Sequence, residues 1–255
     1  MEQFHVEVKD YIAVVTHDHP PVNSHNTTTR EELIEVFDEL HDRADVRVII
    51  LTGRGKYFSG GADLVERPTL DVNPGDYVRH NRRVREYFNA ISDCDKPVIA
   101  AINGPCVGAG MGLMMACDIM LASDNAFFAM PELDVGIAGG GGFLMRHFTK
   151  SRTRAMYFTC RRYPASEMYR LGVVEAVVPQ DKLLDEAMSY ARDIAKKSPL
   201  AVQAAKRVFQ TIAEMPLRDA YKYEQTVTVA LAKSEDTKEA QKAFLEKREP
   251  VFKGR

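Results

Sequence analysis

Two apolar strands in this sequence are each followed, a few residues later, by a glycine-rich segment. The first strand is 46–52 (VRVIILT), and its glycine-rich segment is 58–63 (FSGGAD). The second strand is 97–102 (PVIAAI), and Gly108-Ala109-Gly110 follows it. Continuous apolar runs of this length are typical of strands buried on both faces of a sheet. If the two strands are neighbours, both glycine-rich segments lie at the same edge of that sheet.

The rest of the pattern predicts strands and helices in alternation, and then helices alone. Alternating residues predict a hairpin over 4–17, and helical spacing of apolar residues predicts helices at 31–44 and 77–92. We further expect short strands at 118–122, 126–130 and 173–178, and helices from 180 onward. This order favours a layered α/β core. We therefore divide the chain into a core domain, 1–195, and a C-terminal helical region, 196–255.

Composition argues against several classes of function. The 255 residues carry a net charge of −2, which gives no electrostatic reason to expect binding to nucleic acid or to an anionic membrane. The spacing of the four cysteines fits neither a zinc site nor a redox pair, so we expect no metal. We infer a reducing, cytoplasmic location, because the N-terminus is unlike a signal peptide and no apolar run is long enough to span a bilayer.

The glycine-rich segments suit one kind of chemistry. Small residues let a backbone approach a ligand closely, and the start of a helix leaves N–H groups without partners. Two N–H groups, one from each segment, would then converge on one oxygen as an oxyanion hole, aided by the dipole of the helix after Gly110. The phosphate-binding pattern GxxxxGK[ST] is absent, and GAGMG does not fit GxGxxG. Two tight turns that serve only helix packing remain the alternative.

Five segments carry a more specific signal: GRGKYFSGGADL, PVIAAINGPCVGAGMGLMMACDIMLAS, AFFAMPELDVGI, LGVVEAVVP and SEDTKEAQKAFLEKREPVFKGR. In this order, through nearly the whole chain, they resemble the enoyl-CoA hydratase/isomerase (crotonase) superfamily. The resemblance implies an α/β superhelix of repeated ββα turns and a C-terminal helical trimerisation region, hence a homotrimer or a dimer of trimers. It also implies an acyl-CoA substrate, with coenzyme A as part of the substrate and no separate cofactor.

The resemblance places the two oxyanion donors at the backbone N–H groups of Ala62 and Ala109. Ala109 stands where the family usually has glycine, which preserves the donor but narrows the approach to it. The backbone of Ala62-Asp63-Leu64 is expected to meet the adenine and pantetheine portions of CoA, and Gly61 is assigned with it to substrate binding.

The family's hydratases use two glutamates, and this sequence has one of them. Glu132, in Met130-Pro131-Glu132, matches the second glutamate, whereas the first falls on Gly112, which cannot transfer a proton. Hydration uses one group to activate water and another to protonate carbon, but a single carboxylate beside an enolate is enough to move a proton between carbons. Helix capping or an ion pair is the structural alternative for Glu132.

The acyl pocket is expected around the glycine run 139–142, where the family often has proline and fewer glycines. Such a run indicates a roomy or mobile pocket, lined by Gly140 and Phe143, with plain helix packing as the alternative for Phe143. A roomy pocket favours a cyclic or branched acyl group. Lys247 matches a family lysine that reaches the nucleotide phosphate of a neighbouring subunit, and a solvated helix face is the alternative there.

These residues together predict an enzyme of the enoyl-CoA hydratase/isomerase family. It would stabilise a thioester enolate with Ala62 and Ala109 and use Glu132 as the acid/base, on a cyclic or branched enoyl-CoA. A ring-opening hydrolase of a cyclic β-keto acyl-CoA is the alternative reaction. A family member that only binds its ligand, without catalysis, is the alternative class.

Overall fold

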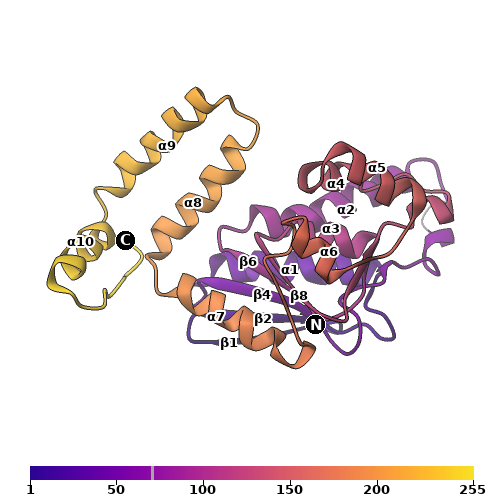
Figure 1. Cartoon of the computed structure of the whole chain (residues 1–255), viewed down its shortest axis with the longest axis horizontal. Coiled ribbons are helices and arrows are strands. Elements are labelled where there is room, and N and C mark those ends of the chain that lie inside the picture. Colours follow the sequence, from indigo (N-terminus) through magenta and orange to yellow (C-terminus); the bar gives the residue numbers. More distant parts are fainter. Residues whose placement is uncertain (70–71) are drawn as a thin grey trace.

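A computed structural model of the chain describes residues 1–69 and 72–255, and a six-stranded sheet lies at its centre (Figure 1). The strands follow the order β1 (Phe4–Lys9), β2 (Ile12–His17), β4 (Val48–Gly53), β6 (Val98–Ile102), β8 (Ile119–Ser123) and β11 (Ala176–Val178). β1 and β2 form the predicted antiparallel hairpin, and every later pairing in this sheet is parallel. β4 and β6 are neighbours, so the two glycine-rich segments do leave the sheet at the same edge.

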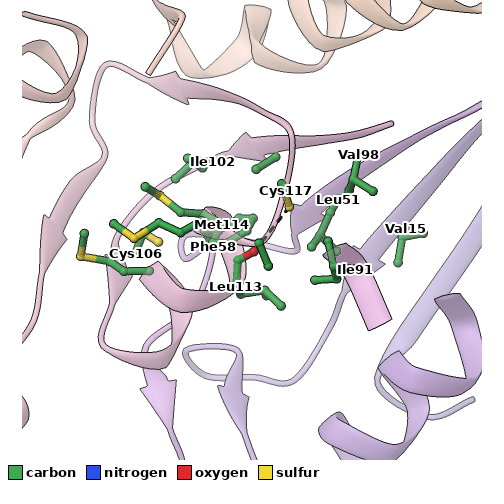
Figure 2. Packing of buried hydrophobic residues seen from close by; sticks show 14 of the residues in the cluster. Val15, Leu51, Phe58, Ile91, Val98, Ile102, Cys106, Leu113, Met114 and Cys117 are labelled. Atoms are coloured by element: carbon green, nitrogen blue, oxygen red, sulfur yellow. Dashed lines mark hydrogen bonds between the residues drawn. The ribbon is translucent and has the colours of Figure 1, made fainter. Parts of the chain in front are cut away.

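Successive residues of each central strand point to opposite faces of the sheet. Because these residues are apolar on both faces, helices cover both faces. In β4, Ile49 and Leu51 pack in one cluster with residues of α1 (Thr27–Asp42), α2 (Asp76–Asp93) and α3 (Ala109–Met115). Val48 and Ile50 face the other way, against α7 (Leu183–Ala195). Figure 2 shows the larger cluster, in which the Cys117 thiol donates to the Leu113 carbonyl oxygen. Both strand runs are therefore buried on two faces, as their unbroken apolar sequence predicts.

Short strands form two smaller sheets, and the sequence pattern predicted β9 (Phe127–Ala129) but not its partners. β3 (Ser24–His25) pairs with β5 (Gly61–Ala62), and β9 lies between β7 (Cys106–Val107) and β10 (Tyr163–Pro164). The predicted strands at 118–122 and 126–130 exist as β8 and β9, but they join different sheets. The succession β4-β5-α2, then β6-β7-α3, then β8-β9-α4 (Gly141–His147) gives the repeated ββα turns expected of the fold.

The remaining helices follow in chain order. They are α5 (Lys150–Thr159) and α6 (Ala165–Arg170), then α8 (Pro199–Ile212), α9 (Leu217–Leu231) and α10 (Glu235–Glu246), with short 3-10 turns η1 (Arg67–Thr69), η2 (Glu132–Val135) and η3 (Gln180–Lys182). Pro199 and Pro216 mark helix starts, as predicted. α8 to α10 extend away from the sheet (Figure 1). The ammonium of Lys206 in α8 fastens them to the core, 2.8 Å from the Asp118 carboxylate.

No helix within residues 1–69 and 72–255 has the length and apolar character needed to cross a bilayer. In the same described part of the chain, no group of three or more His, Cys, Asp or Glu side chains is arranged to hold a metal ion.

Candidate active site

The two glycine-rich segments run side by side at an unusually close distance. The Val107 N–H donates to the Ser59 carbonyl oxygen at 2.9 Å, which joins the segments directly. A Cβ on Gly61, whose φ is +92°, would lie 2.7 Å from the Val107 carbonyl oxygen and 3.3 Å from the Ala109 nitrogen. A side chain has no room there, so glycine is what allows the backbone of β5 to approach the start of α3.

This approach brings the two predicted donors to one cavity. Directly after β5, the Asp63 N–H donates to the His25 carbonyl oxygen of β3 at 3.1 Å. Because successive N–H groups of a strand point to opposite sides, the Ala62 N–H points away from β3. The Ala109 N–H, in the first turn of α3, has no hydrogen-bond acceptor in the part of the chain that the structure describes. Both residues line a cavity of about 440 Å³.

Ser59 holds the first donor segment in place. Its hydroxyl donates to the Asn23 carbonyl oxygen at 2.8 Å and accepts the Gly61 N–H at 3.0 Å. The same oxygen lies 2.7 Å from His25 Nε2. A hydroxyl has one hydrogen to donate, so Nε2 carries the imidazole proton and donates to Ser59. These bonds fix the turn that presents the Ala62 amide.

The Glu132 carboxyl group lies against the start of α3. η2 begins at Glu132, directly after Pro131, and a Cβ placed on Gly108 would be only 2.8 Å from Glu132 Oε1. Burial raises the pKa of this carboxyl above its ordinary value of 4.5. Its Oε2 atom is buried without a hydrogen-bond partner among the described residues. A half-buried acid with a raised pKa beside a helix start is typical of a catalytic position.

The structure brings most of the predicted site residues together. The larger cavity is lined by Ala62, Ala109, Gly112, Glu132, Gly140 and Phe143 among others. A smaller cavity of about 120 Å³ is lined by Gly61 and Leu64, and it shares Ala62, Gly108, Glu132 and Ile137 with the larger one. The two cavities therefore adjoin at Ala62 and Glu132, and we call them together the cleft.

A side chain at Gly112, where the sequence lacks an acid, would crowd the ring of Phe88. A Cβ at this position would lie 3.0 Å from ring carbons of Phe88. Phe88 in turn packs edge-on against Phe143, with ring centroids 5.1 Å apart. Glu132 is the one carboxylate among the described residues that line the larger cavity. The position that matches the family's first glutamate is thus crowded by aromatic side chains.

Two predicted residues lie outside this cleft. Asp63 lines neither cavity, and its carboxylate accepts the backbone N–H groups of Val65 and Glu66 at 2.8 and 3.2 Å. Asp63 therefore holds its own turn. Lys247 follows α10, far along the C-terminal extension, and lines neither cavity of this chain.

The sequence did not predict the side of the larger cavity that α2 and the segments next to it form. The cavity is also lined by His25, Arg30, Arg67, Tyr77, His80, Asn81, Val84, Arg85, Tyr87 and Phe88. Burial lowers the pKa of His25 well below its ordinary value, and it also lowers that of His80. The helical recurrence of Tyr77, Asn81, Val84 and Phe88 at steps of three and four was the available signal.

Comparisons with known proteins identify the family. The family model described as enoyl-CoA hydratase/isomerase matches residues 7–255. Carnitinyl-CoA dehydratase of Escherichia coli K12 is 38% identical over 267 residues, which cover 100% of this chain and 99% of that protein. The protein of the same name from Citrobacter koseri is 36% identical over the same coverage. The chain belongs to the enoyl-CoA hydratase/isomerase family and is an enzyme of that family.

Solved structures agree with this assignment. An enoyl-CoA hydratase from Bacillus anthracis superimposes with a TM-score of 0.93 at 32% identity, covering 99% of this chain and 100% of that one. Pseudomonas aeruginosa DspI gives the same TM-score and identity over 99% and 97% of the two chains. The predicted crotonase-like α/β fold is confirmed.

The close backbone approach at Gly61 can be tested against a matched glycine. Gly55 also has a positive φ, +73°, but no atom within 4 Å of its added Cβ. Gly55→Ala should cost about 1–2 kcal/mol of unfolding free energy from the left-handed backbone alone. Gly61→Ala should cost more and lower kcat/KM about 100-fold, as loss of one oxyanion donor does. Denaturant unfolding and acyl-CoA kinetics measure both, and full activity of Gly61→Ala would contradict this geometry.

The raised pKa of Glu132 predicts a pH-dependent cost in stability. A carboxyl whose pKa is higher in the folded than in the unfolded protein stabilises the fold below pH 4.5, and that contribution is lost as the pH rises through the folded pKa. Glu132→Gln cannot ionise. Its free energy of unfolding should therefore increase relative to that of the native protein as the pH rises from 4.5 through the folded pKa of Glu132. Thermal unfolding of both proteins at several pH values measures the difference. A difference that does not change with pH would refute the raised pKa.

Proposed function

We propose that this enzyme binds an acyl-CoA thioester with its carbonyl oxygen between the Ala62 and Ala109 N–H groups, and that Glu132 moves a proton on the acyl chain. One observation supports this above the rest: two backbone amides and a single half-buried carboxyl group border the same cavity. The smaller cavity, beside Gly61 and Leu64, offers a path for the pantetheine arm.

The proposed chemistry begins with loss of a proton next to the thioester. The Glu132 carboxylate takes the proton, the electron pair moves into the carbonyl, and the oxygen becomes negative. Each well-placed amide then stabilises that oxygen by about 3–4 kcal/mol more than it stabilised the neutral carbonyl. Burial suits Glu132 to this role, since a carboxyl with a raised pKa also holds a proton well enough to return it to another carbon.

Glu132 alone favours proton transfer over two-acid hydration. The cavity wall opposite offers Gly112 and the Phe88 ring where a second carboxyl group would stand. We therefore infer a hydratase/isomerase-type reaction, carried by one acid, on a cyclic or branched enoyl-CoA. Ring-opening hydrolysis of a cyclic β-keto acyl-CoA is the second candidate, because it also needs one group that activates water and an enolate that is later protonated.

The names of the relatives suggest a carnitinyl-type acyl group, and the charge of the cavity argues against it. A carnitinyl group carries a permanent positive charge. The lining includes Arg30, Arg67 and Arg85, and Glu132 beside the thioester site is its one acid among the described residues. A cationic acyl group would meet repulsion from this wall.

We infer in addition that α8 to α10 contact other copies of the chain in a trimer or a dimer of trimers. Large apolar side chains there are exposed, with Phe244 at 82% and Leu245 at 80% of their surface. An apolar surface of this kind is typical of an interface. In such an assembly Lys247, two residues further on, would bind the CoA phosphate of a neighbouring subunit, since it lies far from the cleft of its own chain.

Glu132→Gln separates catalysis from binding. It should lower turnover of an acyl-CoA panel, with cyclic, branched and straight-chain members, by a factor of about 100 to 10,000, because the proton acceptor is lost. Binding of saturated, unreactive thioesters should stay within about threefold, since the amides remain. Mass spectrometry of products and titration calorimetry measure the two effects. Glu214→Gln, which changes an exposed acid paired with Arg146, is the matched control. Undiminished turnover by Glu132→Gln would overturn the assignment.

A further inference from the structure

The wall of the larger cavity carries an excess of positive charge that the proposed chemistry does not use. Arg30, Arg67 and Arg85 line it, and Glu132 is the one acid facing them among the described residues. Coenzyme A enters past Ala62 and Leu64, on the side of the smaller cavity, which has no arginine in its lining. The three guanidinium groups therefore border the space left for the acyl group.

These arginines differ in how far they are neutralised. Arg30 is buried and pairs with Glu66, its Nη2 lying 3.0 Å from the carboxylate. Arg67 donates to the Tyr77 hydroxyl at 2.6 Å, a neutral partner. Among the residues 1–69 and 72–255, neither Arg67 nor Arg85 forms an ion pair with a carboxylate. Two charges on this wall thus lack a counter-charge within the described protein.

Resting on the function proposed above, we propose that the acyl group bound here carries a carboxylate at the end remote from the thioester, held by Arg67 and Arg85. The substrate or product is then the CoA thioester of a dicarboxylic acid. Such a group supplies the counter-charge that these two arginines lack among the described residues. Ring opening of a cyclic β-keto acyl-CoA by water also yields a thioester of this class, since the cleaved ketone carbon becomes a carboxylate.

Binding of unreactive thioesters tests this directly. Glutaryl-, adipyl- and pimelyl-CoA are each compared by calorimetry with their own monomethyl esters, which remove only the charge, and with a trimethylammonium-ended acyl-CoA. At least one diacid thioester should bind about 10-fold or more tightly than its ester, and the cationic thioester most weakly. Equal affinity of every diacid and its ester would overturn the proposal. If no thioester of any kind binds, the proposed function itself fails.

Two variants assign the preference to residues. Arg67→Gln and Arg85→Gln should each reduce the preference for the diacid over its ester and leave the affinity for the ester unchanged. Arg82→Gln is the matched control, because Arg82 is exposed on the same helix and does not line the cavity. A loss of affinity that is equal for diacid, ester and free coenzyme A would place the arginines on the CoA phosphates and refute the proposal.

Discussion

The contact between β5 and the start of α3 is the constraint on which the rest of the site depends. Gly61 lets the two backbones meet where any Cβ would clash with the Val107 carbonyl oxygen. Gly110 does the same from the other side, since its Cβ would lie 2.8 Å from that of Ser59. The approach brings Ala62 and Ala109, one from each segment, to the same cavity. In the proposed function, fixed backbone dipoles rather than charged side chains stabilise the thioester oxygen there.

Much of this arrangement could be predicted from the sequence, for identifiable reasons. The apolar runs of β4 and β6 indicate strands buried on both faces, and the glycines after them indicate a shared edge. The two-residue strands β5 and β7 carry no such periodicity, because their partners come from distant segments. The role of Glu132 rests on the family resemblance. No spacing within the chain shows that its carboxyl group reaches Gly108.

The acyl end of the cleft was less predictable, because it is built from one face of α2 and from loops on either side. Arg67 precedes that helix and Arg85 lies within it, so only the fold shows that both border one cavity. The same helix brings Phe88 over Gly112. A single helix thus crowds the position of a second acid and brings the charge of Arg85 to the same cavity. In the proposed function, this links the reaction to the choice of substrate.

The central claim is that two main-chain amides polarise one thioester carbonyl. Difference infrared spectroscopy of a bound, saturated acyl-CoA with ¹³C at the thioester carbonyl measures that polarisation directly. Two donors aimed at the oxygen weaken the C=O bond, so the labelled band should move to lower wavenumber when the thioester passes from water to the protein. A band at the same wavenumber in both would show that the oxygen does not lie between the Ala62 and Ala109 amides.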